Sequence, residues 1–356
     1  MKRLLPLALA AAAATLSGPA MAADFSGKRI EWIIPFQEGG GTDVWARFIQ
    51  PPLARELPGK PTIIIRNVPG GGSTTGANQF AQRAKPDGLT LLGTSGSTQF
   101  PYLLDDPRVK YDYKDWTPLW ASPTGGVVYV RPELGIKNAS EIKKILNEPM
   151  KYGSQGATSL DLVPLLAFEL LGMKVDPVFG MEGRGAGRLA FERGEAKIDY
   201  QTSSAYLKQV VPLVEQGKAV PLFSWGMLDD AGNLQRDPTF PNLPHFGEVY
   251  EIVHGKKPSG PGFDAYKAFV TAGFGAQKAM FVPKTTPKDV VDTYTQAIGR
   301  VLNDAEFRKA AEEDLGQYPQ YTGERAQALV TQAVTIAPEA KQWVKDWLTR
   351  KYHVKF

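Results

Sequence analysis

The chain has 356 residues, of which 43% are hydrophobic and 22% charged, and its formal net charge is +4. These values are typical of a soluble globular protein of one large or two ordinary domains, and so small a charge gives no support to nucleic-acid binding. Cysteine is absent and only three histidines are present, so thiol chemistry is excluded. We predict no metal site and no other cofactor.

The first residues have the pattern of a secretory signal peptide. Lys2 and Arg3 supply a basic start, residues 4–16 form an apolar run, and Ala20-Met21-Ala22 is a small-residue cleavage site. The run is too short to span a bilayer, and no later stretch reaches about 18 apolar residues. We therefore expect residues 1–22 to be removed before Ala23 and the mature protein to lie in the periplasm.

Strands that end in glycine-containing loops follow in the first part of the mature chain. Residues 29–35, 61–66 and 89–92 are apolar or β-branched runs, and helices are predicted at 43–57 and 77–84. Strand, loop, helix and strand in this order predict a parallel sheet with helices on its faces. Ligands bind such sheets at the carboxyl ends of the strands, where the loops gather.

The loop Gly39-Gly40-Gly41-Thr42-Asp43 is the first candidate for an anion site. Three glycines leave backbone N–H groups uncovered, and the helix that follows adds the positive end of its dipole. The loop lacks the Lys-Ser/Thr pair of a nucleotide-binding P-loop and the G-x-G-x-x-G spacing of a dinucleotide site. The alternative is a tight turn in which Asp43 only caps the helix.

A second α/β unit begins near residue 123, and its loops carry polar side chains. Arginine suits a carboxylate because its planar fork donates two parallel hydrogen bonds, and hydroxyl groups add neutral donors. The candidates are Arg184, Arg188, Thr158, Ser159, Thr202 and Ser203. The predicted strands lie near 127–131, 151–153, 176–179, 198–201 and 219–225, and the predicted helices at 140–147, capped by Ser140, and 160–171.

The remainder of the chain is predicted to complete the first unit. Residues 226–275 form a long connection with a helix near 262–270, and a strand at 274–282 precedes helices at 287–302, 304–313 and 324–351. We predict an α/β protein of two lobes, each a mostly parallel sheet flanked by helices, with the ligand cleft between them. The predicted domains are 23–122 with 246–356, and 123–245.

Catalytic interpretations have little support. Gly93-Thr94-Ser95-Gly96-Ser97 is similar to a nucleophile elbow but ends in serine, and no histidine stands in a recognisable motif. Two alternatives to a binding protein remain open. One is a periplasmic α/β hydrolase or isomerase that uses Ser95 or a carboxylate, and the other is a ligand-presenting sensor with the same fold.

Several motifs in order resemble those of the tripartite tricarboxylate transporter substrate-binding proteins, the Bug family. They are Ile34-Pro35-Phe36 with the glycine loop and Val44-Trp45-Ala46-Arg47, Asn67 with Pro69-Gly70-Gly71-Gly72, residues 86–92, Tyr152-Gly153-Ser154 with Gly156, and residues 282–287. The similarity spans essentially the whole mature chain. Each motif alone is weak, but their ordered combination is specific.

The resemblance implies a monomeric periplasmic binding protein of the type II-like, Venus-flytrap kind. Such a protein closes on a small organic carboxylate and delivers it to integral membrane permease subunits, without catalysis. Backbone amides of residues 36–43 and the loop 154–159 would hold the ligand, with bridging waters. The complete candidate set is Phe36, Gly39, Gly40, Gly41, Thr42, Asp43, Ser95, Ser154, Gln155, Ala157, Thr158, Ser159, Arg184, Gln201 and Thr202.

The chain departs from the family pattern in its ligand loops. Val68 stands where an arginine is usual, Asp161 and Leu162 lie near the place of a common histidine, and residues 179–183 replace an aromatic-Lys-Gly motif. The class of protein is unchanged by these differences. We expect residues 154–161 and 179–188 to decide which carboxylate binds.

Overall fold

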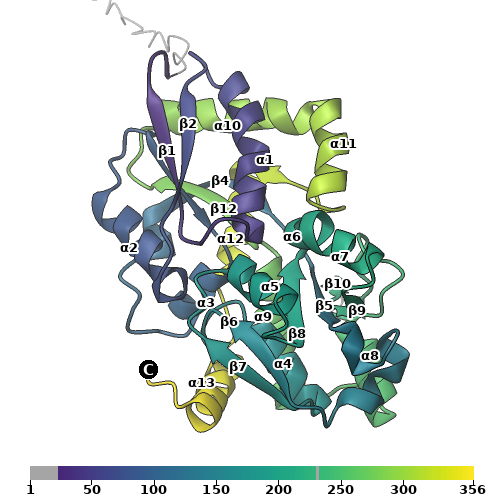
Figure 1. Ribbon diagram of the computed structural model, residues 1–356. Helices are drawn as coiled ribbons and strands as arrows, with labels where there is room; N and C mark the ends of the chain where they lie inside the picture. Colours follow the sequence, from purple (N-terminus) through teal and green to yellow (C-terminus); the bar gives the residue numbers. More distant parts are fainter. Residues whose placement is uncertain (1–22, 230–231) are drawn as a thin grey trace, which may run out of the picture.

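Six strands from distant parts of the chain form the sheet of the first lobe, in the upper half of Figure 1. The computed structural model describes residues 23–229 and 232–356, so the predicted signal peptide lies outside the described residues. The strand order is β13-β4-β12-β3-β1-β2. The strands are β1 (Arg29–Ile34), β2 (Thr62–Asn67), β3 (Thr90–Thr94), β4 (Trp116–Ser122), β12 (Lys278–Pro283) and β13 (Tyr321–Thr322).

The sheet of the first lobe is mixed rather than mostly parallel, which corrects the prediction. β1 pairs in parallel with β2 and β3, as expected, but β12 lies between β3 and β4 and runs antiparallel to both. The chain returns from the second lobe into β12, so this strand starts at the interlobe edge, where β3 ends. The register pairs Ala279 with Thr94, which places the neighbouring Lys278 at the predicted ligand edge.

Helices cover both faces of this sheet. Trp32 of β1 packs against Trp45, with ring centroids 5.3 Å apart, while the adjacent Ile33 belongs to the hydrophobic cluster of the opposite face with Phe80. Burial on both faces explains why β1 is a continuous apolar run. The helices are α1 (Gly41–Glu56), α2 (Thr74–Arg83), α10 (Lys288–Asn303), α11 (Ala305–Asp314) and α12 (Gly323–Ala333), whereas α3 (Gly96–Leu103) follows β3 and buries Phe100 and Leu103 in a hydrophobic cluster shared with the second lobe.

The second lobe, in the lower half of Figure 1, also contains a mixed arrangement of strands. β5 is antiparallel to β8 and β9, whereas β6 and β7 are parallel. β5 is the first strand after the chain enters the second lobe, and β12 is the first strand after it returns to the first lobe. Each of these two strands starts at the interlobe edge and is antiparallel to its neighbours. The strands are β5 (Gly126–Val130), β6 (Met150–Ser154), β7 (Val175–Phe179), β8 (Ile198–Thr202) and β9 (Val220–Ser224), with a small hairpin of β10 (Met227–Leu228) and β11 (Leu234–Gln235).

Two parts of the chain assigned by sequence to the first domain pack on the second lobe instead. Phe246, Tyr266 and Trp347 are buried in the same hydrophobic cluster as Val128 and Leu166. We therefore propose that the second lobe comprises residues 123–275 and 338–356. Its helices are α4 (Leu162–Leu171), α5 (Arg184–Glu192), α6 (Ser203–Ala205), α7 (Val211–Glu215), α8 (Phe246–His254), α9 (Pro261–Phe274) and α13 (Pro338–Tyr352).

Three local predictions differ from the structure. The helix predicted over 324–351 is two helices, because Pro338 starts α13 after an extended residue. The helix predicted at 140–147 is a 3₁₀ helix over Ala139–Ile145, and its cap is Asn138 rather than Ser140. The connection 226–275 contains α8, which was not predicted. Within residues 23–229 and 232–356, no helix combines the length and apolarity needed to cross a bilayer.

Candidate functional site

The first glycine loop ends at the N-terminus of α1, and the first turn of this helix lines a cavity between the lobes. Gly40 is the N-cap, and within the described chain no side chain caps the helix. The described residues offer no hydrogen-bond acceptor to the N–H groups of Gly41 and Thr42. A helix of 16 residues that starts with unpaired amides presents two donors and the positive end of its dipole to this cavity.

Asp43 stabilises this loop through hydrogen bonds on the side away from the cavity, and it does not cap the helix. Its carboxylate accepts hydrogen bonds from the Gly39 N–H at 2.9 Å, the Asn67 amide at 3.0 Å and the Arg47 guanidinium at 3.0 Å. The Arg47 charge balances the Asp43 charge, and Asp43 is absent from the described lining of the cavity. The predicted residues Gly39 and Asp43 are therefore structural neighbours of the cavity.

The glycines of the first lobe lie directly against the second lobe. A Cβ atom at Gly41 would lie 2.0 Å from Thr202 Oγ1, and one at Gly185 would lie 3.1 Å from the Gly40 backbone nitrogen. The Ser204 hydroxyl also donates to the Gly41 carbonyl oxygen at 3.2 Å. Glycine at these positions lets the two backbones approach, which a side chain would prevent.

A second set of contacts joins α3 to the loop after β6. The Ser97 hydroxyl donates to Gln155 Oε1 at 3.1 Å and accepts from the Leu160 N–H at 3.1 Å. Ser95 caps α3 by accepting a hydrogen bond from the Ser97 N–H. The predicted residues Ser95 and Gln155 both line the cavity, and Ser97 and Leu160 join them.

Other predicted residues of the 154–161 loop stabilise the loop itself. The Ser154 hydroxyl donates to Asp161 at 3.0 Å, and the Ser159 hydroxyl donates to the Gly156 carbonyl oxygen at 2.7 Å. Asp161 is fully buried and also accepts a hydrogen bond from the Gln155 N–H. None of Ser154, Ser159 and Asp161 is among the described residues that line the cavity.

Ala157 and Thr158 lie at a wider hollow of about 440 Å³ that opens beside the cavity. Thr158 donates to Asp106 at 2.7 Å and accepts from Arg108 at 2.8 Å, so an ion pair of the first lobe binds the second. Gln155 lines both the hollow and the cavity. Residues of both lobes line this hollow, which makes it the mouth of the interlobe space.

Arg184 reaches the cavity, but its donors are already used. The guanidinium pairs with Asp199 and with Asp161, the latter at 3.3 Å, and donates to the Gly153 carbonyl oxygen at 2.6 Å. It also donates to the Tyr200 carbonyl oxygen at 3.1 Å. Burial, only partly offset by the Arg184 charge, raises the pKa of Asp199. The positive charge of Arg184 is thus balanced inside the second lobe.

Of the remaining polar candidates on α5 and β8, Gln201 and Arg188 bond to other protein groups, whereas Thr202 lines the cavity. Gln201 donates to the Arg184 carbonyl oxygen at 2.8 Å and is not among the described lining residues. Arg188, whose side chain is largely buried, pairs with Glu192 one turn later on α5. Thr202 lines the cavity, and its buried hydroxyl makes no hydrogen bond to the described residues.

The cavity between the lobes has a volume of about 20 Å³, which is about the space of one water molecule. Eight of the twelve described lining residues carry polar or charged side chains, and none of the twelve is acidic. The Gln155 amide nitrogen and the Gln277 amide oxygen are buried without hydrogen-bond partners in the described chain, as is the Thr202 hydroxyl. The lining residues are Phe36, Gly40, Gly41, Thr42, Ser95, Ser97, Gln155, Leu160, Arg184, Thr202, Gln277 and Lys278.

Lys278 is the most consequential lining residue that sequence reasoning missed. Its side chain is 3% exposed and makes no hydrogen bond or ion pair with the described residues. Burial lowers the pKa of the Lys278 ammonium well below its ordinary value. A lysine at the first position of an otherwise apolar strand was the available signal. Its significance depends on the direction of β12, which sequence reasoning did not predict.

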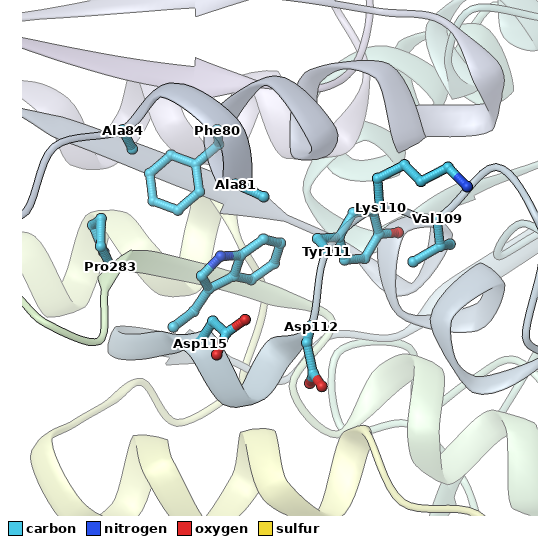
Figure 2. A pocket seen from close by; sticks show the side chains of 10 residues that line it. Phe80, Ala81, Ala84, Val109, Lys110, Tyr111, Asp112, Asp115 and Pro283 are labelled. Atoms are coloured by element: carbon cyan, nitrogen blue, oxygen red, sulfur yellow. The ribbon is translucent and has the colours of Figure 1, made fainter.

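A separate hollow of about 390 Å³ lies on the first lobe alone. Figure 2 shows Pro283 on one side and Lys110 on the other, with the ring of Phe80 between them. The described lining comes from α2, from the segment before β4 and from the ends of β4 and β12. This hollow includes none of the predicted site residues and does not reach the interlobe space.

Comparison with known proteins places the chain in a family. The family model described as the tripartite tricarboxylate transporter family receptor matches residues 45–334. The chain belongs to this family. Among curated relatives of this chain, a UPF0065 protein of Bordetella pertussis is 32% identical over 209 residues, which are 57% of this chain and 62% of the relative. The aligned part of the chain therefore spans less than two thirds of that relative.

Solved structures confirm the fold of the receptor. The periplasmic binding protein BugD is 23% identical, with a TM-score of 0.67 over 92% of this chain and 98% of that chain. MatC from Rhodopseudomonas palustris, solved with bound malate, is 21% identical, with a TM-score of 0.62 over 90% of this chain and 97% of that chain. The family match therefore confirms the predicted resemblance, and the solved structures confirm the predicted two-lobed fold.

Proposed function

We propose that the protein is a periplasmic receptor that captures a small organic carboxylate between its lobes. It then delivers the ligand to the integral membrane permease subunits of a tripartite tricarboxylate transporter. The observation that carries this proposal is the interlobe cavity, where the uncapped start of α1 provides amide donors and no described lining residue is acidic. The bound malate of MatC, a protein of the same fold, supports a carboxylate as the ligand.

In this proposal the two lobes each supply part of the clamp. The Gly41 and Thr42 amides donate to one carboxylate from the first lobe, and Gln155 and Thr202 contribute unpaired polar atoms from the second. The ligand favours the closed arrangement because it contacts both lobes there and only one when they separate. A ligand larger than one water needs the lobes to part, and the mouth beside Gln155 is the route of entry.

We propose binding without catalysis. The Ser95 hydroxyl accepts a hydrogen bond from the Ser97 N–H as the cap of α3. His245 caps α8, His254 contacts the Leu170 carbonyl oxygen, and His353 ends α13, so the chain's histidines lie on other elements. Ser95 has none of them as a general base in the lining of its cavity. The hydrolase alternative gains no support from this arrangement.

The cellular setting forms part of the same proposal. The predicted signal peptide and the family description support a receptor in the periplasm that meets its permease at the membrane, and we propose that it acts as a monomer. A sensor with the same pocket would instead meet a membrane kinase. Genes for permease subunits beside the gene of this receptor would favour transport over signalling.

A thermal-shift screen of residues 23–356 tests the proposal. The panel contains L-malate, succinate, adipate, L-aspartate and benzoate, with glucose and calcium chloride as controls. A ligand present at 100 times its Kd stabilises the folded protein by about 2.7 kcal/mol, so a carboxylate that binds raises the melting temperature in a dose-dependent way. A rise with glucose or calcium only, and with none of the carboxylates, would contradict the proposal.

A further inference from the structure

The interlobe cavity contains a basic side chain that has no acidic partner in the described chain. Lys278 is 3% exposed at the start of β12, and its amine has no ion-pair or hydrogen-bond partner among the described residues. Burial of an amine without a partner favours its neutral form, and a carboxylate that binds beside it favours the protonated, charged form. The cavity is the space into which such a group would bind.

The neighbours of Lys278 strengthen this point. A Cβ atom at Gly41 would lie 3.3 Å from Lys278 Nζ, which places the ammonium beside the first turn of α1. Thr202 and Ser204 approach the same position from the second lobe with neutral hydroxyl groups. On β4, the register partner of Lys278 is the neutral Ser122. The groups near the Lys278 amine are therefore backbone amides of α1 and neutral hydroxyl groups. Asp43, the acidic residue in the first turn of α1, is already paired with Arg47.

The other cation of the cavity differs from Lys278. Arg184 is equally buried, but Asp161 and Asp199 contact its guanidinium directly. These three groups balance one another within the second lobe. Lys278 is therefore the described lining residue whose basic group has no acidic partner.

We infer that Lys278 forms an ion pair with a carboxylate of the bound ligand, beside the amides of Gly41 and Thr42. This inference rests on the proposed function and makes it more specific. One basic group without an acidic partner and one helix N-terminus in the first lobe match one fully buried carboxylate. The described cavity lining offers no acidic side chain to a ligand ammonium, so we expect an organic acid without an amino group to bind more tightly than its amino-acid counterpart.

A pair of variants separates this role from a structural one. Lys278→Met keeps the length of the apolar stem and removes the charge, and Lys278→Gln gives a shorter neutral substitute. The matched control is Lys284→Met, because Lys284 is an exposed residue just after the same strand. Titration calorimetry with L-malate, succinate, adipate and L-aspartate measures the affinity of each protein, and thermal unfolding without added ligand measures its stability.

The expected results are specific. Wild type and Lys284→Met bind at least one of the organic acids with the same affinity, and they bind L-malate more tightly than L-aspartate. Lys278→Met and Lys278→Gln bind that acid at least about 30-fold more weakly, because removal of one partner from a buried charge pair leaves the other unpaired. Without ligand, the melting temperature of Lys278→Met rises by about 2 °C or more, since an apolar group replaces a buried amine that has no partner.

Two results would contradict the inference about Lys278, and a third would contradict the proposed function. An affinity of Lys278→Met within threefold of wild type overturns the inference and leaves the proposed function standing. A fall in melting temperature of both Lys278 variants without ligand also overturns it, because the lysine is then part of the folded structure. A wild-type protein that binds none of the carboxylates overturns the proposed function itself.

Discussion

Gly41 of the first lobe lies directly against Thr202 of the second, so closely that a Cβ atom at Gly41 would lie 2.0 Å from the threonine hydroxyl oxygen. Gly41 begins α1 and Thr202 ends β8, so the contact joins the two strand-end loops that line the cavity. The glycine therefore serves two purposes. It exposes the helix amides, and it permits the lobes to meet.

Gly41→Ala is expected to weaken carboxylate binding. The added methyl must displace Thr202 or hold the lobes apart, and overpacking of this kind typically costs about 1–3 kcal/mol. We expect the Kd measured by calorimetry to rise by about 5- to 150-fold. Gly299→Ala on α10 is the control, because a Cβ atom there meets nothing within 4 Å. Equal affinity of both variants and wild type would show that the Gly41 contact does not limit closure.

Asp43→Ala is expected to reduce stability and binding together. The buried carboxylate accepts hydrogen bonds from Gly39, Asn67 and Arg47, so its removal releases the loop that positions α1. We expect the free energy of unfolding in urea to fall by about 2–3 kcal/mol and carboxylate affinity to fall at least about tenfold. Glu38→Ala, which removes an exposed partner of Arg47, should change stability by less than about 1 kcal/mol. Similar losses in the two variants would argue against a positioning role for Asp43.

Arg184→Met and Arg188→Met compare two arginines of the same helix. Removal of Arg184 leaves Asp161 and Asp199 buried without their cation, and we expect stability to fall by about 3–5 kcal/mol. Among the described residues, Arg188 pairs with the partly exposed Glu192 alone, so its removal should cost less than that of Arg184, about 1–2 kcal/mol. Urea unfolding of both variants provides the measurement. Unchanged stability of Arg184→Met, with lost binding, would instead make Arg184 a ligand contact.

His245 gives the stability of the protein a predicted pH dependence. Its Nδ1 accepts from the Gly247 N–H as the cap of α8, and burial lowers the pKa of the imidazole below 6.5. Because the folded pKa lies below the unfolded one, the unfolded state binds more protons, and stability is lost as pH falls through this range. Protonation removes a cap worth about 1 kcal/mol. His245→Asn retains a capping oxygen, so urea unfolding at pH 5 and pH 7.5 should differ less for this variant than for wild type. An identical difference in both proteins would exclude His245 as the cause.

Much of the first lobe followed from local sequence patterns. The apolar run of β1, its glycine loop and α1 lie within two residues of their predicted bounds, since each depends on nearby residues. The direction of β12 could not be predicted in the same way. It depends on the chain having crossed to the second lobe and back. This crossing pairs Lys278 with Ser122, which is far away in the sequence, so no local pattern predicts it.

The same limit applies to the candidate site. Eight predicted residues line the cavity, namely Phe36, Gly40, Gly41, Thr42, Ser95, Gln155, Arg184 and Thr202. Loop chemistry and family resemblance were enough to identify them. Whether a polar side chain faces the cavity or its own loop depends on tertiary contacts, as the hydrogen bonds of Ser154 and Asp43 illustrate. Lys278 was missed because it is the first residue of β12, whereas ligand-binding residues were expected only in the loops that follow the carboxyl ends of strands.

The most direct test of the central claim is a crystal structure of residues 23–356 grown with the carboxylate that raises the melting temperature most. We predict one carboxylate group within hydrogen-bond distance of the Gly41 and Thr42 amides and of Lys278 Nζ, with Gln155 or Thr202 contacting the ligand from the second lobe. A carboxylate bound in the hollow of Figure 2, or held by one lobe alone, would contradict the account.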